Sequence, residues 1–311
     1  MMQNKKELVS VIIRTLNEEK HLPELLNSIK NQSSNDFDAE IVIVDSGSTD
    51  KTLDIAESYS ARITFIEKEN FSFGRSLNLG CEFAKGKYLV FVSGHCIPTD
   101  ENWLHNLVLP LKDGVCHYTY GRQEARDTTK FSERQLFSKY FPENSSIPQE
   151  GFFCNNANAA LLRGEWEKNN FDDQLTGCED MELAKRLCAK GKYIGYVAGA
   201  SVFHIHDETW PQVKTRYERE AVALQKIMPE VHLTKFDVMK FFLAGVAKDM
   251  RAARSQHVFI GNFVSIIMFR WAQYSGAYVG NHSAREVSRK VKNRYFYPRV
   301  TDMAIKEKYD D

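Results

Sequence analysis

The amino-terminal part of the chain alternates short apolar runs with amphipathic stretches, and this alternation restricts the fold more than any other feature. The runs rich in Val, Ile and other apolar residues have the length and composition of strands: Val9–Arg14, Glu40–Val44, Arg62–Ile66 and Tyr88–Val92. The stretches between them have the period of helices: Glu18–Lys30, Lys51–Ser58 and Gly74–Ala84. Strands that alternate with helices predict a mainly parallel sheet with helices on both faces.

The rest of the chain shows a weaker pattern. The expected strands are Val115–Gly121, Phe152–Leu162, Tyr193–Val197 and Ser201–His206, and the expected helices are Asp180–Lys190 and Trp210–Met228. A length of 311 residues with 43% apolar residues permits a large core. We expect a Rossmann-like α/β domain over residues 1–230 and a helical C-terminal extension over residues 231–311.

Charge and cysteine content exclude several classes of protein. Lys plus Arg and Asp plus Glu each number 41, so no net field attracts a polyanion, and nucleic acid is not an expected partner. The start MMQNKKELVSVIIR lacks the long apolar run of a signal peptide, which predicts a cytoplasmic protein. Six cysteines without CxxC spacing predict reduced thiols instead of a disulfide framework or a zinc ribbon.

Polar residues follow three of the predicted strands. In a parallel sheet, ligands bind beyond these carboxyl ends, which here are Arg14–Asn17, Asp45–Asp50 and Ser93–Cys96. Asp45 closes a buried strand, where a carboxylate without a partner is costly, so we expect it to meet a ligand or a protein donor. Asp50 is expected to cap the next helix. No GxGxxG follows the first strand, which disfavours a dinucleotide dehydrogenase.

Histidines near strand ends form a second group of candidates. A single histidine such as His95 is most often a hydrogen-bonded structural residue. His204 and His206 stand two apart on a predicted strand, so both side chains would point to one face and could share a metal or phosphate with His95. Cys96 and Cys154 are disfavoured as nucleophiles; in the case of Cys96, strand neighbours point to opposite faces and His95 is poorly placed to activate the thiol.

Two acidic residues, Glu179 and Asp180, open a predicted helix. Negative charge at this position complements the helix dipole, and that role alone would account for both residues. The same position at the active edge of a sheet also suits a general base. The residues by themselves leave both roles open.

Taken in order, several segments resemble the family 2 glycosyltransferases, especially the bacterial rhamnosyltransferase-like branch with the GT-A fold. The segments include SVIIRTLNEEKHL, IVIVDSGSTDKT, FSFGRSLNLGCEFAKGKYLVF and GCEDMELAKRL, and the resemblance extends over about Val9 to Met228. It implies that the donor nucleotide lies beside a set of polar residues: Thr15, Asn17, Glu18, Asp45, Ser46, Arg75, Asn78, Ser93 and Gly94.

The resemblance also implies roles in the reaction. Asp180, assisted by Glu179, would accept the proton of the acceptor hydroxyl. The acceptor side would include Asn155, Asn156 and Trp103. Ser93-Gly94-His95 stands where the family usually has an acidic metal motif. The histidines would therefore approach the diphosphate or hold a divalent cation, Mn²⁺ or Mg²⁺, and imidazole suits softer metals better than Mn²⁺. They are His95, His204 and His206.

The implied activity is inverting transfer of a sugar from a nucleoside-diphosphate sugar to a hydroxyl of a glycan or lipid-linked saccharide. The product would be a cell-surface polysaccharide such as O-antigen or capsule. The departing diphosphate needs positive charge, from a cation held by the histidines or from protonated histidines with Arg75 or Lys214. Two other classes stay open: a non-catalytic nucleotide-binding or scaffolding module, and a nucleotidyltransferase, although RTLNEEK is not a glycine-rich basic loop.

The C-terminal region is poor in charge. Arg270 is the one charged residue from Ser255 to Ala284, and the uncharged part Ser255–Phe269 is shorter than the roughly 20 residues that span a bilayer. Packing on the catalytic domain or on a homodimer partner would explain such a segment. Aromatic residues followed by a basic segment also predict peripheral contact with the inner face of the plasma membrane. That segment contains Arg285, Arg289, Lys290, Lys292, Arg294 and Arg299 against Glu286.

Overall fold

The computed structural model describes residues 6–34 and 36–283. These residues fall into two compact units. The first runs to Thr129 and adds Leu136–Gln174 and Glu179–His206, and the second combines Lys130–Gln135, Leu175–Cys178 and the chain from Asp207 onward. Within the described residues, no helix combines the length and the apolar character needed to cross a bilayer.

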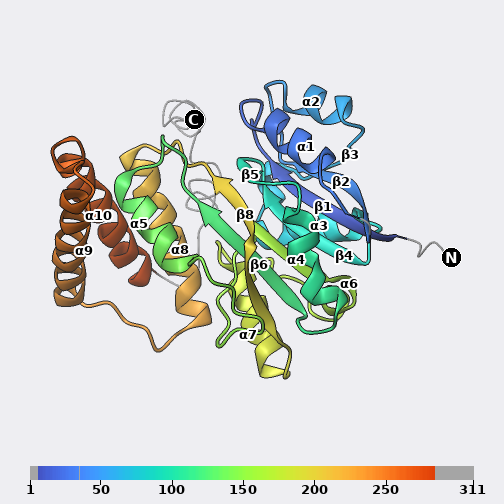
Figure 1. The fold of residues 1–311 in the computed structure, drawn as a ribbon. Helices are drawn as coiled ribbons and strands as arrows, with labels where there is room; N and C mark the ends of the chain where they lie inside the picture. Colours follow the sequence, from blue (N-terminus) through green and yellow to red (C-terminus); the bar gives the residue numbers. More distant parts are fainter. Residues whose placement is uncertain (1–5, 35, 284–311) are drawn as a thin grey trace, which may run out of the picture. The chain divides into compact units, whose positions relative to one another are not determined.

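The first unit is built on one mixed sheet (Figure 1), whose strands follow the order β3-β2-β1-β4-β7-β6-β8-β5. β1, β2, β3 and β4 are parallel to one another, β6 and β8 form a parallel pair, and β7 and β5 run antiparallel to their neighbours. The bounds are β1 (Glu7–Thr15), β2 (Phe37–Asp45), β3 (Arg62–Phe65), β4 (Tyr88–Ser93), β5 (Cys96–Pro98), β6 (Tyr118–Glu124), β7 (Asn158–Leu162) and β8 (Ile194–His204). The predicted mainly parallel sheet is confirmed.

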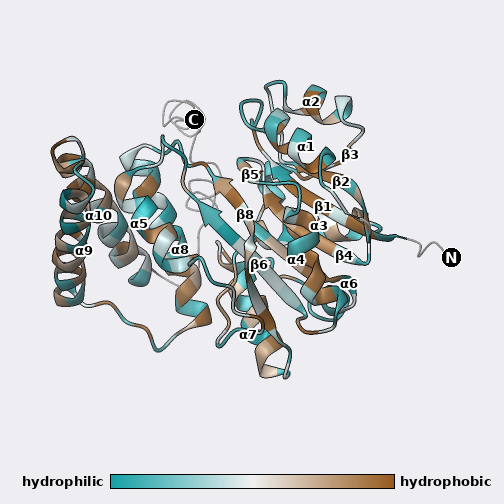
Figure 2. Ribbon diagram, viewed as in Figure 1, coloured by the Kyte–Doolittle hydropathy of each residue, from teal (hydrophilic) through white to brown (hydrophobic). Residues whose placement is uncertain are grey.

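Helices cover both faces of this sheet. Val11, Ile12 and Ile13 are all buried although neighbours in a strand point to opposite faces, so neither face of β1 meets solvent. Figure 2 shows the hydrophobic character of these central strands. The helices of this unit are α1 (Leu22–Lys30), α2 (Thr52–Ser58), α3 (Phe73–Phe83), α4 (Trp103–Lys112), α6 (Arg163–Lys168) and α7 (Glu179–Ala189), while α5 (Phe131–Tyr140) begins in the second unit.

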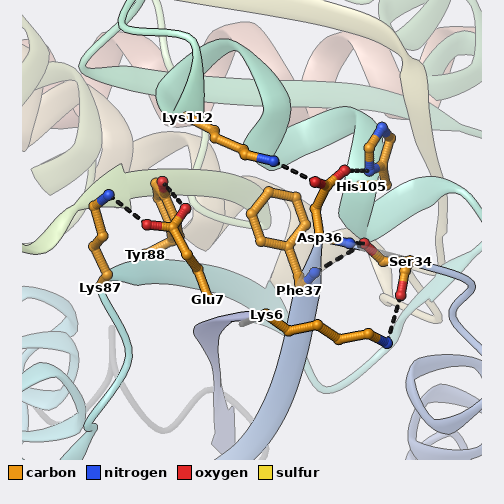
Figure 3. Close-up of polar contacts among 9 residues, drawn as sticks. All are labelled: Lys6, Glu7, Ser34, Asp36, Phe37, Lys87, Tyr88, His105 and Lys112. Carbon is orange, nitrogen blue, oxygen red and sulfur yellow. Dashed lines mark hydrogen bonds and ion pairs between the residues drawn. The ribbon is translucent and has the colours of Figure 1, made fainter. Parts of the chain in front are cut away.

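Ion pairs and hydrogen bonds close the amino ends of the strands (Figure 3). Glu7 of β1 accepts hydrogen bonds from Lys87 Nζ at 2.6 Å and from the Tyr88 hydroxyl at 2.8 Å. The hydrogen bond from Lys87 lowers the pKa of the Glu7 carboxyl. Asp36, just before β2, pairs with Lys112 of α4. This edge of the sheet is therefore tied together by its own side chains, and the opposite edge is the one to examine for a ligand.

Several elements differ from the sequence prediction. The expected strands Tyr193–Val197 and Ser201–His206 are one strand, β8, with a register shift on its β6 partner: Gly121 pairs with Val197 and Gln123 with Val202. Residues 198–201 thus lie opposite a single residue of β6, which interrupts the polarity pattern. The expected strand Phe152–Leu162 is ordered as a strand only over β7. The short strand β5 and the helices α4 and α5 were not expected.

The second unit is helical and contains α8 (Trp210–Ile227), α9 (Lys235–Ser255) and α10 (Phe259–Asn281). The backbones of α8 and α10 come close at two glycines. A Cβ on Gly276 would lie 2.3 Å from the Lys214 carbonyl oxygen, and one on Gly280 would lie 2.1 Å from the Glu218 carbonyl oxygen. Because α8 packs in this way on α10, it belongs to the same compact unit as α9 and α10, whose longest segment starts at Asp207.

A buried ion pair joins α9 to α10. Arg270 donates from Nε to Asp249 Oδ2 at 2.7 Å and from Nη2 to Asp249 Oδ1 at 2.8 Å, and both side chains are buried. The two parallel hydrogen bonds fix the geometry of the helical hairpin. The basic segment expected to contact membranes, residues 285–299, lies outside the described residues.

Candidate active site at the carboxyl edge of the sheet

Strand register brings the predicted site residues to one edge. Thr15 pairs with Asp45 at the ends of β1 and β2, and Arg14 pairs with Ser93 at the end of β4. The antiparallel strand β7 begins at this same edge, because Asn158 pairs with Val92. The end of β8 also lies here, since His204 pairs with Cys96, which opens β5 just after β4. Residues far apart in sequence therefore meet where the parallel strands end.

The Asp45 carboxylate is satisfied by the protein. It is 1% exposed. Oδ2 accepts from Thr15 Oγ1 at 2.9 Å and from Ser48 Oγ at 2.5 Å, while Oδ1 accepts from the Gly47 and Ser48 backbone N–H groups. Ser46 Oγ donates to the Thr15 carbonyl at 3.1 Å. The sequence predicted that Asp45 meets either a ligand or a protein donor. The donors are N–H and hydroxyl groups of the turn after β2 and the hydroxyl of Thr15, and Asp45 holds that turn in shape.

The neighbouring loop after β1 is tied to the same turn. Asn17 has a φ of 57°, a left-handed conformation that asparagine tolerates better than most residues. Its Oδ1 accepts from the Thr49 N–H at 2.8 Å, and its N–H donates to Ser48 Oγ at 2.9 Å. Lys51 is the N-cap of α2, and Asp50, one residue earlier, accepts the Thr52 N–H at the first position of the helix. The polar rim beside β1 and β2 is therefore held in shape by its own hydrogen bonds.

Three histidine rings gather at this edge. His95 lies in the turn after β4, and its Nδ1 is 3.0 Å from Glu18 Oε1. His204 ends β8, and its Nδ1 is 2.7 Å from Gln123 Oε1. The His95 centroid lies 5.3 Å from that of His204 and 5.9 Å from that of His206, and 4.1 Å separate the last two. His206 lies beyond the end of the strand, so the loop after β8, and not strand alternation, sets its ring beside His204.

The turn that carries His95 requires a residue without a side chain. A Cβ on Gly94 would lie 2.8 Å from Glu18 Cγ. Ser93 is held by its N–H, which donates to the Ala157 carbonyl at 3.3 Å. Gly94 therefore lets the Glu18 side chain pass close to the backbone and reach His95.

This cluster has the chemistry of a metal-ligand set. One ligand nitrogen from each of His95, His204 and His206 lies within 4.8 Å of the others. Carboxylate and amide oxygens behind the rings of His95 and His204 provide the outer support that metal-ligating imidazoles usually have. Imidazole suits zinc-like transition ions better than Mg²⁺, which prefers oxygen ligands. The residues therefore fit a divalent transition ion better than the hard cation of an acidic motif.

The acidic pair lies at the start of α7. The Asp180 side chain accepts the Asn156 N–H at 2.7 Å and the Met181 N–H at 2.7 Å. Glu179 Oε1 lies 3.6 Å from Arg14 Nη1, which projects from the end of β1. Asp180 is only 9% exposed, and burial together with the negative charge of Glu179 raises the pKa of its carboxyl to about 7. A carboxyl with this pKa can exchange a proton near neutral pH.

The predicted acceptor-side asparagines adjoin Asp180. Asn156 donates its backbone N–H to this carboxylate and accepts from the Tyr118 hydroxyl at Oδ1. Asn155 Oδ1 accepts the Ala157 N–H at 3.0 Å. Burial raises the pKa of the nearby Cys154 thiol, which keeps it protonated, as expected for a cysteine that is not a nucleophile.

Trp103 was predicted on the acceptor side, and this prediction is wrong. The ring is fully buried on the inner face of α4, and its Nε1 donates to Asn158 Oδ1 at 2.9 Å. A side chain without exposed surface cannot contact a saccharide. Trp103 instead anchors α4 to the sheet behind the site.

Arg75 and Asn78 of α3 contact the segment that precedes α7. Arg75 Nη2 donates to Asp173 Oδ2 at 2.8 Å, and Nη1 donates to the Asn70 carbonyl at 2.9 Å. Asn78 Nδ2 donates to the Phe171 carbonyl, and Oδ1 accepts from the Phe171 N–H. Both residues therefore fix a loop, and their contact with a nucleotide stays a prediction.

From the sequence alone, Arg14 was given no role and was named only within the strand end Arg14–Asn17, and Gln123 was not named. Arg14 had one available signal, a cation at the carboxyl end of the first predicted strand. Gln123 lies in β6, beyond the bounds of the expected strand, and its role depends on the register that brings His204 beside it.

Solved structures with similar coordinates define the class of fold. The mannosyltransferase PcManGT from Pyrobaculum calidifontis, in complex with GDP-Man and Mn²⁺, matches with a TM-score of 0.61 over 95% of this chain and 89% of that chain, at 18% identity. Glucosyl-3-phosphoglycerate synthase from Mycobacterium tuberculosis, in complex with Mn²⁺, UDP-Glc and phosphoglyceric acid, matches with a TM-score of 0.51 over 71% and 80% of the two chains, at 20% identity. The fold is therefore of the GT-A class.

Sequence comparison names the family. The model of glycosyl transferase family 2 matches residues 10–167, just over half of the 311 residues, and the chain belongs to this family. The O-antigen chain rhamnosyltransferase WbaN of Salmonella anatum is 30% identical over 192 residues, which cover 58% of this chain and 60% of the relative. The putative glycosyltransferase EpsH of Bacillus subtilis (strain 168) is 36% identical over 206 residues, which cover 64% and 53%. The chain thus spans little more than half the length of these two curated relatives.

Proposed function

We propose that the protein transfers a sugar, with inversion, from a nucleoside-diphosphate sugar to a hydroxyl group of a saccharide or lipid-linked saccharide. The observation that carries this proposal is the position of Asp180: a largely buried carboxylate at the ligand-binding edge of the sheet, hydrogen-bonded to the backbone of Asn156. Family membership supports the transferase class, and the named O-antigen relative supports a role in cell-surface polysaccharide synthesis.

Asp180 acts as the general base. Its carboxylate takes the proton of the acceptor hydroxyl as that oxygen forms a bond to the anomeric carbon. The bond between this carbon and the diphosphate oxygen breaks on the opposite face, and the diphosphate keeps the electron pair. The negative charge of Glu179 raises the pKa of Asp180 and so makes it a stronger base. Arg14 Nη1 lies 3.6 Å from Glu179 Oε1, and its positive charge partly offsets the negative charge of the two acids.

The nucleotide lies along the rim formed by β1 and β2. Asn17, Gly47 and Thr49 are exposed there, and the buried hydrogen bonds of Asp45, Ser46 and Thr15 beneath them hold this polar surface in a preformed shape. A surface that needs no rearrangement loses little conformational entropy when it binds a ligand.

The histidine cluster holds the diphosphate end of the donor. His95, His204 and His206 would be the ligands of a divalent cation, and such a cation neutralises charge on a departing diphosphate. Gln123 and Glu18 orient the rings for this purpose. The competing arrangement uses protonated imidazoles in place of the cation, and it predicts activity that is insensitive to chelators.

The test is the substitution Asp180→Asn in the full chain. A thermal-shift panel of nucleotide sugars, including dTDP-rhamnose, first identifies the donor as the compound that raises the melting temperature. The variant should keep this shift and lose sugar transfer by a factor of about 100 or more, the usual contribution of a general base. A variant that transfers sugar at the wild-type rate would overturn the proposal. A wild-type protein that binds a donor and transfers nothing to any saccharide would favour the non-catalytic nucleotide-binding module instead.

A further inference from the structure

The outer face of α10 is apolar along most of its length. Ile260 is 93% exposed and Val264 is 68% exposed, and Met268 and Trp271 are also exposed. The spacing of four, four and three residues places these side chains on one stripe of the helix. Arg270 is the one charged residue of α10, and it is buried in its ion pair with Asp249. No charge of its own therefore interrupts this stripe.

The outer face of α9 combines apolar and basic residues. Phe236 is 77% exposed, and Met239 and Leu243 follow it on the same stripe. The exposed basic residues of this helix include Lys240, Lys248, Arg251 and Arg254. The two acidic residues of α9 have other partners: Asp237 accepts from the Thr234 hydroxyl in the capping box, and Asp249 is buried in its ion pair with Arg270. Figure 2 shows hydrophobic and hydrophilic turns alternating along α9.

The two stripes belong to one hairpin surface. The Phe242 and Trp271 ring centroids lie 5.8 Å apart, and those of Phe241 and Tyr274 lie 6.3 Å apart, so the helices pack side by side. The hairpin has its own hydrophobic cluster, in which Ala253 and Ile266 are buried together with Phe131 of α5; the partly buried members are Val246, Met250, Ala252 and Phe259.

Such a surface is costly to leave in water. Contiguous apolar area of this kind on a soluble protein marks an interaction site. A second copy would be a poor occupant, because two-fold pairing brings the same basic residues of both copies to one interface. An anionic lipid surface suits both features, since apolar side chains enter the boundary between headgroups and acyl chains and cations meet the headgroups.

We propose that the α9–α10 hairpin is a docking surface for an anionic membrane, with Ile260, Val264 and Trp271 inserted at the interface and Lys240 and Arg251, which flank the apolar stripe of α9, on the lipid headgroups. This inference rests on the exposed faces of the second unit and is independent of the sugar-transfer chemistry. It would concentrate the enzyme where lipid-linked acceptors lie.

The test is co-sedimentation of the full chain with vesicles of phosphatidylcholine alone and of an equimolar mixture with phosphatidylglycerol. The wild type should partition about tenfold more strongly to the anionic vesicles, and added salt should reduce this preference. The double variant I260S/V264S and the double variant K240E/R251E should each lose binding by about tenfold or more. Val115→Ser, an exposed apolar position in the first unit, is the matched control and should bind like the wild type.

Unchanged melting temperatures in the double variants would show that the fold is intact, since the replaced side chains are exposed. Equal partitioning of wild type and I260S/V264S would overturn the proposal. A wild type that fails to sediment with anionic vesicles would also overturn it. So would light scattering that shows a wild-type dimer converted to monomer by I260S/V264S, because the surface would then be occupied by a second copy.

Discussion

Replacing Glu179 by Gln should move the acid limb of the pH–rate profile to lower pH. The Asp180 carboxyl has a pKa of about 7, so roughly one-tenth of it is ionised at pH 6 and roughly nine-tenths at pH 8. A general base works only when ionised, and kcat/KM of the wild type should rise about tenfold between these two pH values. Burial is the larger cause of the raised pKa, and the charge of Glu179 is the second.

The substitution removes the second cause and leaves the first. Arg14, which lies 3.6 Å from Glu179, also lowers the pKa of Asp180. In Glu179→Gln its positive charge is no longer paired with the Glu179 carboxylate, so this lowering adds to the loss of the negative charge. A neighbouring charge of this kind shifts a pKa by about one unit or more. The midpoint should therefore fall to about pH 6, and kcat/KM at pH 6, relative to the plateau, should rise about fivefold.

The assay is the initial rate of nucleoside diphosphate release at low donor concentration, because kcat/KM reports the free enzyme. Glu182→Gln is the matched control, since Glu182 lies on the same helix and pairs with Arg186. Its midpoint should stay within a few tenths of a pH unit of the wild type. Equal midpoints in the wild type and Glu179→Gln, or a wild-type midpoint near pH 4, would refute the assignment of Asp180 as a base tuned by Glu179.

Three further results are expected. Co²⁺ added to the full chain should give visible absorption bands, with Co²⁺ affinity reduced about tenfold or more in His95→Ala and unchanged in His105→Ala at the amino ends of the strands. Identical Co²⁺ titrations of the wild type and His95→Ala would contradict a metal site at the histidines, and effective competition by equimolar Mg²⁺ would argue against a transition ion. The free energy of unfolding should fall by at most about 1.4 kcal/mol per pH unit as pH rises from about 4 to about 7, because the folded state keeps the Asp180 proton that the unfolded state releases. Chemical denaturation at several pH values should show a smaller decline in Asp180→Asn, and a decline equal to that of the wild type would contradict this reasoning. Gly276→Ala should destabilise the helical unit by about 1–3 kcal/mol, because its Cβ would lie 2.3 Å from the Lys214 carbonyl oxygen, whereas Gly261→Ala, with open space around it, should change the melting temperature little.

Much of the secondary structure could be predicted from local sequence patterns. The runs that became β1, β2, β3 and β4 were placed within a few residues, because β1, β4 and the second half of β2 are largely buried and read as apolar runs, while β3 is a short β-branched run at the partly exposed edge of the sheet. Elements that depend on a distant partner were missed. The three-residue strand β5 exists through its pairing with β8, and the register shift in β8 exists through β6. Neither has a local pattern.

The candidate site divides in the same way. Motif order by itself pointed to the polar strand ends, to the histidines and to Asp180, since residue type and position after a strand are properties of the sequence. Tertiary structure decided their environments: the donors to Asp45, the removal of Trp103 into the core, and the pairing of Arg14 with Glu179. The physical reason is that hydrogen bonds, burial and pKa depend on which side chains the strand register brings within a few ångströms, and register is set by packing over the whole sheet.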